Sequence, residues 1–251
     1  MNLGLKGKNA IVTGGSKGIG RSIAHALAEE GTNVAICARG EEALRQTEKE
    51  LIDTGVKVYA ATCDVGDFDK LDAFLEAASD TLGGVDILVN NVSALSLGDN
   101  LQDWEASLKV DLMASVRGAR KVIPGMIEAG GGSIIFISST SALEAGSPPP
   151  YAAAKAAIVS YSKTIAIELA PKNIRVNSIA PGSIEFEGGV WAHTKQANPD
   201  FYNMVLSTIP SGRMGTPEEV GKLTAFIASP CASWVTGACI SVDGGQHRSN
   251  L

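Results

Sequence analysis

Short apolar runs alternate with longer amphipathic stretches along the whole chain, and this alternation constrains the fold more than any other feature. The apolar runs predict strands at 8–13, 33–38, 56–61, 85–90, 133–138, 174–179 and 238–242. The amphipathic stretches predict helices at 18–31, 40–54, 67–82, 101–129, 151–170 and 216–228. Strands that alternate with helices through short connections run parallel and are joined by right-handed crossovers. The sequence therefore predicts an α/β fold, a doubly wound parallel sheet of about seven strands with helices on both faces.

Composition and charge narrow the class of protein. No linker, repeat or low-complexity tract divides the 251 residues, so we expect residues 1–251 to form a single domain. A net charge of −6 without a basic block gives no support to nucleic-acid binding. The first residues do not form a signal peptide, and no apolar run approaches the ~18 residues of a membrane helix. We expect a protein without a nucleic-acid or membrane partner.

The four cysteines give no sign of a metal site. Cys37, Cys63, Cys231 and Cys239 form no CxxC pair and no spacing typical of metal ligands. Buried, reduced thiols are the simplest interpretation, and they are typical of a cytoplasmic protein. We expect no bound metal.

A glycine-rich segment, TGGSKGIG at 13–20, joins the first predicted strand to the first predicted helix. Gly14 and Gly18 allow a tight turn and a close approach of the backbone to a ligand, and Gly20 allows close helix–strand packing. Backbone amides at the helix start then face a pyrophosphate. An ordinary strand–helix turn is the alternative, but the position of the loop favours a nucleotide. The predicted cofactor contacts of the loop are Gly14, Ser16, Lys17, Gly18, Ile19 and Gly20.

The end of the second predicted strand indicates which dinucleotide binds. NAD recognition calls for an acidic residue there, to bind the ribose 2′-hydroxyl. The sequence instead has Ala38 followed by Arg39. A guanidinium suits a 2′-phosphate, and Lys17 could add a second cation. NADP (NADPH) is therefore favoured over NAD.

With these features the sequence resembles the short-chain dehydrogenase/reductase family over essentially its whole length. Six segments carry the resemblance in the family's order: 13–20 (TGGSKGIG), 63–65 (CDV), 90–93 (NNVS), 151–155 (YAAAK), 177–182 (NSIAPG) and 242–245 (VDGG). The resemblance implies a Rossmann-type fold and a homotetramer in which the helices near 101–129 and 151–170 pack across twofold axes. It also implies further cofactor contacts at Asp64, Val65, Asn91, Tyr151, Lys155, Pro181, Gly182 and Ile184.

Tyr151 and Lys155 are the predicted catalytic pair. Four residues apart at a helix start, they lie on one face, so the ammonium can stabilise a tyrosinate. Such a tyrosine can exchange a proton with a substrate oxygen. In the family this lysine also holds the nicotinamide ribose, and a serine after the fifth strand binds the substrate oxygen. Alignment to the family pattern selects Ser139, whereas the spacing to Tyr151 is about equally compatible with Ser138.

Three positions depart from the family pattern. The fourth catalytic residue, usually an asparagine, corresponds here to Asp111, which either joins the proton relay or points to the helix surface. Ser93 replaces the glycine of the NNAG motif. Phe186 stands where a threonine often binds the carboxamide. These departures affect the proton relay and the binding of the nicotinamide.

The substrate is predicted to be a ketone or a secondary alcohol. Apolar side chains between 183 and 210 lie where the family builds its substrate lid, and they indicate a largely apolar pocket. The predicted pocket residues are Ser141, Leu143, Phe186 and Trp191. A 3-oxoacyl carrier-protein reductase is an alternative, although the segment 128–133 lacks the basic residues usual near such a site. A catalytically idle NADP-binding regulatory protein is the second alternative, because of Asp111.

Overall fold

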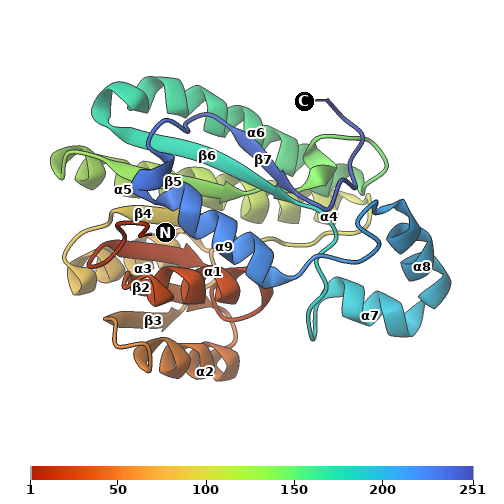
Figure 1. Ribbon diagram of the computed structural model, residues 1–251, viewed down its shortest axis with the longest axis horizontal. Coiled ribbons are helices and arrows are strands. Elements are labelled where there is room, and N and C mark those ends of the chain that lie inside the picture. The colour runs from red at the N-terminus through yellow and green to blue at the C-terminus, as the bar shows by residue number, and fades with distance from the viewer. Residues whose placement is uncertain (1, 251) are drawn as a thin grey trace.

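A seven-stranded sheet with all strands parallel forms the centre of the computed structural model, which describes residues 2–250 (Figure 1). The strand order is β3-β2-β1-β4-β5-β6-β7, so the direction of winding reverses between β1 and β4. The strands are β1 (Asn9–Thr13), β2 (Asn33–Ala38), β3 (Val58–Thr62), β4 (Ile87–Asn90), β5 (Gly132–Ile137), β6 (Ile174–Pro181) and β7 (Cys239–Val242). The predicted fold class is confirmed, and ligands of such sheets bind outside the carboxyl ends of the strands at this reversal.

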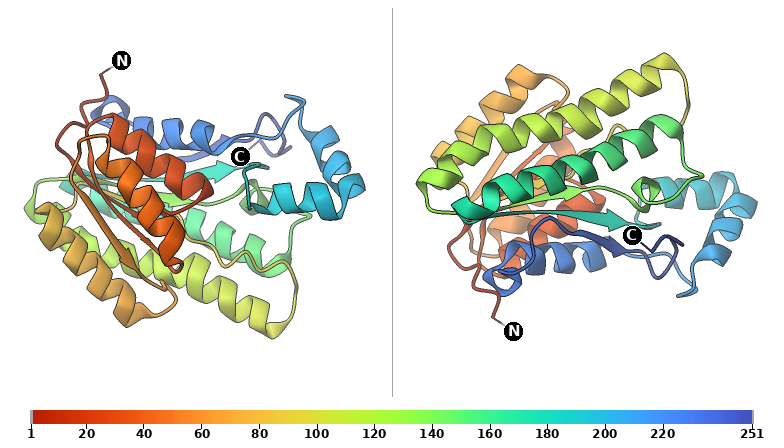
Figure 2. Two further views of the ribbon diagram at one scale, coloured as in Figure 1. Left: turned by 90° about the horizontal axis from the view of Figure 1, so that it is seen from below. Right: turned by 90° about the horizontal axis from the view of Figure 1, so that it is seen from above.

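Helices cover both faces of the sheet (Figure 2). One face packs against α1 (Gly18–Glu29), α2 (Glu41–Ile52) and α9 (Pro217–Ala228). The other packs against α3 (Phe68–Leu82), α5 (Ala114–Glu128) and α6 (Pro149–Leu169). Two more helices, α7 (Val190–Ala197) and α8 (Pro199–Thr208), project beyond the carboxyl ends of the strands (Figures 1 and 2).

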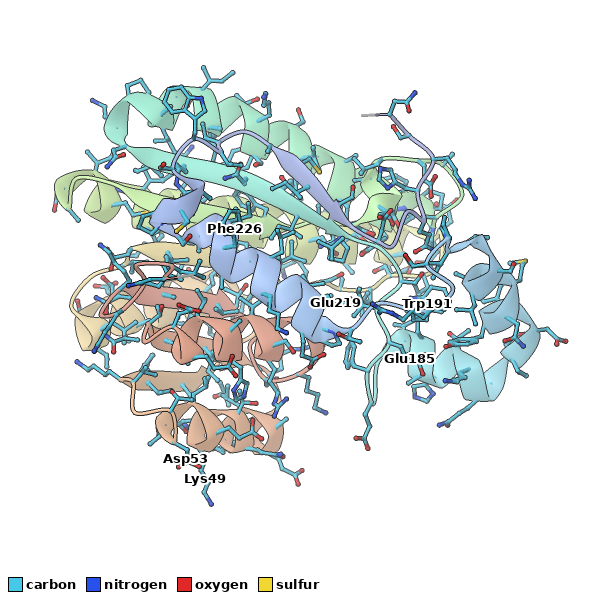
Figure 3. The ribbon with its side chains drawn as sticks, viewed as in Figure 1. Lys49, Asp53, Glu185, Trp191, Glu219 and Phe226 are labelled. Atoms are coloured by element: carbon cyan, nitrogen blue, oxygen red, sulfur yellow. The ribbon has the colours of Figure 1, made fainter. Side chains whose placement is uncertain are left out.

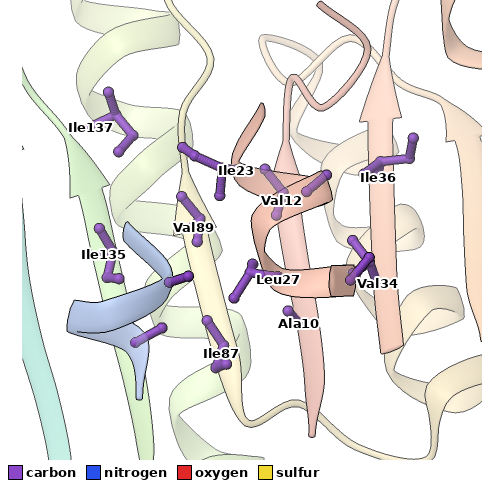
Figure 4. Packing of buried hydrophobic residues seen from close by; sticks show 14 of the residues in the cluster. Ala10, Val12, Ile23, Leu27, Val34, Ile36, Ile87, Val89, Ile135 and Ile137 are labelled. Atoms are coloured by element: carbon purple, nitrogen blue, oxygen red, sulfur yellow. The ribbon is translucent and has the colours of Figure 1, made fainter. Parts of the chain in front are cut away.

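The alternation of side chains along β1 explains why both faces are covered. Ala10 and Val12 belong to the core on the α1 side, whereas Ile11 belongs to the opposite core. Ile23 and Leu27 of α1 pack in the same cluster as Ala10 and Val12 (Figure 4). None of these four side chains has exposed surface. Dense packing on both faces holds the strand ends rigidly. Residues that follow the strands are thereby fixed relative to one another.

The structure differs from the predicted elements in two places. The single helix expected at 101–129 is divided into α4 (Leu101–Ala106), a π-helical turn (Ser107–Met113) and α5. The lid region, for which no helix was predicted, contains α7 and α8. Asn198 caps α8 by accepting a hydrogen bond from the Phe201 N–H, and Pro199 follows at the first helical position. This cap signature is visible in the sequence, whereas nothing in the sequence marks the π-turn.

The N-terminus of α9 carries a capping box. The Glu219 carboxylate accepts hydrogen bonds from the Thr216 N–H (2.9 Å) and from both terminal nitrogens of Arg213 (3.0 and 2.6 Å). The bonds from Arg213, followed by the one from the Thr216 backbone, lower the pKa of Glu219 to about 2. The carboxylate therefore stabilises the folded state.

We expect Glu219→Gln to lower the free energy of unfolding by about 1 kcal/mol at neutral pH, the usual value of a helix cap, because the side chain is 41% exposed. The folded-state pKa lies below the unfolded value of 4.5. The stabilisation is thus fully present above 4.5 and is lost as the pH falls toward about 2. Urea unfolding of both proteins across this range measures it. A difference that does not change with pH would contradict the assignment.

Candidate active site

The loop between β1 and α1 has a backbone that only glycine permits. Gly14 and Gly18 have φ angles of +70° and +51°, in the left-handed region. A Cβ on Gly20 would lie 2.1 Å from the Gly14 carbonyl oxygen, so a larger residue cannot be accommodated. No side chain caps the N-terminus of α1. Its first N–H groups are therefore available to an anion such as a pyrophosphate.

Asn91, which follows β4, holds this loop. Its side-chain Nδ2 donates to the carbonyl oxygens of Thr13 (3.0 Å) and Gly14 (3.2 Å), and its backbone N–H donates to Thr13 Oγ1 (3.0 Å). Asn91 thus fixes the conformation of the glycine loop. Thr13 has an equal part in this network, and sequence reasoning did not assign it a role.

Two unpaired cations lie beside the loop. Arg39 follows β2 and Lys17 precedes α1, and both side chains are exposed. Within residues 2–250 neither forms an ion pair or a side-chain hydrogen bond. At the end of β3, exposed Asp64 accepts a hydrogen bond from the Gly66 N–H (3.0 Å), while Val65 is buried. These side chains outline the space beside the ends of β2 and β3.

A buried ion pair between Lys155 and Asp111 lies next to the ends of β4 and β5. Lys155 Nζ is 3.1 Å from Asp111 Oδ1, and the two side chains are 3% and 0% exposed. The ammonium also donates to the Ile137 carbonyl oxygen (3.0 Å), and Asp111 Oδ2 accepts from the Ala94 N–H (3.2 Å). Asp111 lies in the π-helical turn and does not point to the helix surface. Within residues 2–250 Asp111 Oδ1 has no hydrogen-bond partner, so charge rather than a hydrogen bond joins the pair. Of the three N–H donors of the ammonium only the one to Ile137 is bonded, which leaves N–H donors for a ligand.

Tyr151 lies one helical turn before Lys155, near the start of α6. Its half-buried ring has its centroid 5.7 Å from Lys155 Nζ. Its hydroxyl forms no hydrogen bond with the part of the chain from 2 to 250. The hydroxyl is therefore free to bond a ligand above the lysine.

The two candidate serines have different partners. Ser138 Oγ donates to the Lys155 carbonyl oxygen (3.0 Å), which turns it toward α6. Ser139 Oγ accepts from the Ser141 N–H (3.1 Å) and retains its own proton for a ligand. This difference favours Ser139 as the substrate contact. Ser141 Oγ in turn accepts a hydrogen bond from Ser147 (2.7 Å).

The segment after β6 and the C-terminal segment pack together. Gly182 donates to the Val242 carbonyl oxygen (3.0 Å), and buried Pro181 precedes it. Gln246 bonds both the backbone N–H and the hydroxyl of Ser183 (2.9 and 3.0 Å).

The C-terminal segment also reaches the loop after β5. The Arg248 N–H donates to Glu144 (3.0 Å), next to half-buried Leu143. Sequence reasoning did not assign a role to Gln246 or Arg248. No sequence pattern shows that the segment after VDGG joins the two loops.

The lid is held by a polar cluster. Glu185 accepts a hydrogen bond from the Tyr202 hydroxyl of α8 and pairs with Lys195 of α7 (2.9 Å). The bond from Tyr202, followed by that from Lys195, lowers the pKa of Glu185. The bond to Glu185, followed by burial, raises the pKa of Tyr202. Nearby, Trp191 is stacked on Phe201 with ring centroids 6.2 Å apart. Figure 3 shows Glu185 and Trp191 at the entry to the lid, close to Glu219 of α9.

The predicted pocket residue Phe186 contacts the glycine loop. A Cβ on Gly18 would meet the Phe186 ring at 2.4 Å, so the ring packs on the glycine loop. The preceding Ile184 is buried and forms a backbone bridge with Gly215. Ser141, Leu143 and Trp191 lie in the loop and lid segments around the site.

Residues 2–250 contain neither a membrane-spanning helix nor a cluster of metal-binding side chains. In this range no helix is long and apolar enough to cross a membrane. The same residues contain no group of three or more His, Cys, Asp or Glu side chains that could hold a metal ion.

Comparisons with known proteins extend over nearly the whole chain. Residues 14–247 match the family model described as enoyl-(acyl carrier protein) reductase. The chain is 40% identical over 253 residues to 3-oxoacyl-[acyl-carrier-protein] reductase FabG of Chlamydia muridarum, covering 98% of this chain and 100% of the relative.

Two solved structures show the same fold. The chain resembles 7α-hydroxysteroid dehydrogenase complexed with NADH and 7-oxo-glycochenodeoxycholic acid, with 33% identity, a TM-score of 0.91 and coverage of 97% of this chain and 96% of the other. It also resembles L-sorbose reductase from Gluconobacter frateurii complexed with NADPH and L-sorbose, with 34% identity, a TM-score of 0.90 and coverage of 99% and 100%.

Proposed function

The chain belongs to the short-chain dehydrogenase/reductase family of NAD(P)-dependent oxidoreductases that act on CH–OH groups, and we propose that it transfers a hydride between NADP(H) and a ketone or secondary alcohol. The observation that carries this proposal is the buried ion pair of Lys155 and Asp111 next to Tyr151. These residues lie at the carboxyl ends of the strands, as the glycine loop does. The whole chain is proposed to act as one cofactor-binding domain.

Tyr151 is the proposed general acid and base. In reduction, its hydroxyl donates a proton to the carbonyl oxygen, and in oxidation the tyrosinate takes the proton of the alcohol. The Lys155 ammonium stabilises that tyrosinate, and one of its remaining N–H donors is suited to a ribose hydroxyl. Ser139 donates a hydrogen bond to the same substrate oxygen. The nicotinamide, when bound, supplies or accepts the hydride.

The residues present fit a dinucleotide at the glycine loop. The backbone at Gly14 and Gly20 has no room for a Cβ, and the first turn of α1 offers N–H donors. Asp64 and Val65 are proposed to contact the adenine, and Pro181, Gly182 and Ile184 the nicotinamide end. Arg39, with Lys17, is proposed to bind the 2′-phosphate.

We expect Arg39→Ala to weaken NADPH binding by about 1.5–3 kcal/mol, the usual value of a hydrogen bond to a charged group, with little effect on NADH. Arg45→Ala is a matched control, because its guanidinium is already bonded to Glu48 and the Ala60 carbonyl. Isothermal titration with both cofactors measures the difference. Equal losses for NADPH and NADH would refute the assignment of Arg39.

Two classes of ketone are candidate substrates. A small-molecule ketone fits the apolar lid, whereas the 40% identity to a 3-oxoacyl carrier-protein reductase favours a 3-oxoacyl thioester. Steady-state NADPH oxidation with small ketones, a 3-oxoacyl thioester and an α,β-unsaturated thioester distinguishes them. Reduction of a ketone supports the proposed reaction. Tight NADPH binding without turnover of any compound would indicate the idle regulatory protein.

A homotetramer is proposed, with interfaces through the helices near 101–129 and 151–170 and through the C-terminal strand. Trp234, which precedes β7, is 98% exposed, and Ile167 of α6 is 69% exposed. Thr236 and Gly237 line a groove together with Ile167. Apolar groups gathered in this way are typical of a surface that a second subunit covers.

We expect light scattering to show a tetramer at micromolar concentration. Trp234→Glu should shift the protein to a smaller species, because it places a charge in the proposed interface. Ile52→Glu, which places the same charge at a 54% exposed apolar residue of α2 outside the proposed interfaces, serves as a control for nonspecific effects of charge. A wild-type monomer at this concentration would refute the tetramer.

A cytoplasmic location is also proposed. Cys37, Cys63, Cys231 and Cys239 are all free thiols in the structure, and free thiols are typical of a reducing compartment.

A further inference from the structure

The Phe186 ring lies against the glycine loop between β1 and α1. A Cβ built on Gly18 would lie 2.4, 2.6 and 2.8 Å from three atoms of this ring, so the ring is in van der Waals contact with the Gly18 backbone. Gly18 is the first residue of α1, whose N-terminus has no side-chain cap. A phosphate bound by this loop needs the same space. The ring and the phosphate therefore exclude each other.

Phe186 is also connected to the lid. A Cβ on Gly189 would lie 2.9 Å from the ring, and the Gly189 N–H donates to the Phe186 carbonyl oxygen (3.0 Å). Helix α7 begins at the next residue, Val190. Glu185, the residue before Phe186, bonds Tyr202 of α8 and pairs with Lys195 of α7. A movement of Phe186 is therefore transmitted through Gly189 to α7, while Glu185 ties both lid helices to the segment before Phe186.

The chain on the other side of Phe186 is anchored. Buried Ile184 pairs with Gly215 in a backbone bridge, the Glu185 N–H donates to the Gly215 carbonyl oxygen (2.9 Å), and the Gly215 N–H donates to the Ser183 carbonyl oxygen (2.9 Å). After Phe186 come Gly188, with a φ of +73°, and Gly189. The ring can thus move through its own side-chain torsions and the glycine pair, while the segment before it stays in place.

We propose that Phe186 is a positioning residue that alternates between two placements, one against Gly18 and one displaced by the phosphates of the dinucleotide. The proposal rests on the proposed binding of NADP(H) at the glycine loop. Only the displaced placement is competent to bind, so the apparent affinity is the intrinsic affinity multiplied by the competent fraction. Because Gly189 joins Phe186 to the start of α7, displacement of the ring repositions α7 over the substrate site.

Trp191 of α7 provides a spectroscopic reporter of this movement, because its ring is stacked on Phe201 of the lid. The other two tryptophans, Trp104 and Trp234, are replaced by phenylalanine in the full-length chain, which leaves Trp191 as the only indole. Stopped-flow fluorescence then follows the mixing of this protein with NADPH at increasing concentration. Equilibrium affinities are measured in parallel by isothermal titration, which does not depend on the reporter.

With Phe186 present, we expect the observed rate to reach a plateau at high NADPH concentration, because departure of the ring becomes limiting. In Phe186→Ala the rate should rise linearly, and the apparent Kd should tighten at least about threefold. Phe186→Tyr retains an aromatic ring and should retain the plateau. Met204→Ala, at an exposed residue of α8, should behave as wild type.

Weaker NADPH binding in Phe186→Ala, or a plateau equal to that of wild type, would overturn the proposal while leaving NADP(H) binding intact. Binding of neither NADPH nor NADH by any of these variants would contradict the proposed function and this inference together. A linear rate in the Phe186 protein itself would also overturn the proposal.

Discussion

Tyr151→Phe is expected to lower the turnover of ketone reduction at least ~10²-fold, because it removes the proposed proton donor. The substitution deletes only a hydroxyl that forms no hydrogen bond with the described residues, and the ring above Lys155 stays in place. NADPH binding should change little, since the glycine loop does not involve this hydroxyl. The kcat for the best ketone and the Kd for NADPH measure the two effects separately.

Tyr161→Phe is the matched control. Tyr161 lies on the same helix, and its ring packs edge-on against Phe136 with centroids 5.8 Å apart. Partial burial raises the pKa of Tyr161, so its hydroxyl stays neutral to higher pH. Turnover should be preserved in this variant. A Tyr151→Phe enzyme with turnover close to that of wild type would remove Tyr151 from the chemistry.

Asp111→Asn should shift the alkaline profile of alcohol oxidation by about one pH unit toward lower pH, at the lower end of what a nearby charge causes. The reason is that the Asp111 carboxylate, 3.1 Å from the ammonium, reduces the positive charge that stabilises the tyrosinate. A neutral amide removes this opposition. The rate of oxidation measured as a function of pH tests the prediction.

The same substitution should lower the free energy of unfolding by about 1–3 kcal/mol, somewhat less than full removal of one partner of a buried pair, because an amide oxygen can still accept from the Ala94 N–H. Asp72→Asn is the control, since it breaks a partly exposed pair with Arg117 (2.7 Å) far from Tyr151 in the sequence and on another helix. It should leave the pH profile in place. An unchanged profile in Asp111→Asn would exclude Asp111 from the proton relay.

The parts of the fold that follow from local patterns could be predicted from the sequence. The strand at 33–38 is observed with the predicted bounds. Its apolar run at 34–38 suits a buried strand, and the charged Arg39 follows directly. The glycine loop was predictable for a related reason. Its left-handed φ angles at Gly14 and Gly18 are available almost only to glycine, so the conformation is visible in the residue type.

The parts that depend on tertiary contacts could not be predicted. The π-helical turn turns Asp111 inward onto Lys155, and a one-residue change in helical register has no counterpart in residue type. The choice between Ser138 and Ser139 depends on which hydroxyl meets the Lys155 carbonyl, a contact across 17 residues. Phe186 was assigned to the substrate pocket from its position in the sequence, whereas contact with Gly18 is a property of the folded chain.

Transfer of deuterium from NADPH that carries deuterium at both positions of C4 of the dihydronicotinamide tests the central claim most directly. With the most active ketone, the account predicts that the product alcohol carries deuterium on its carbinol carbon, and that Tyr151→Phe forms this product at least ~10²-fold more slowly. Mass spectrometry of the alcohol locates the label. An alcohol without deuterium on that carbon, or tight NADPH binding with no alcohol formed from any ketone, would contradict the account.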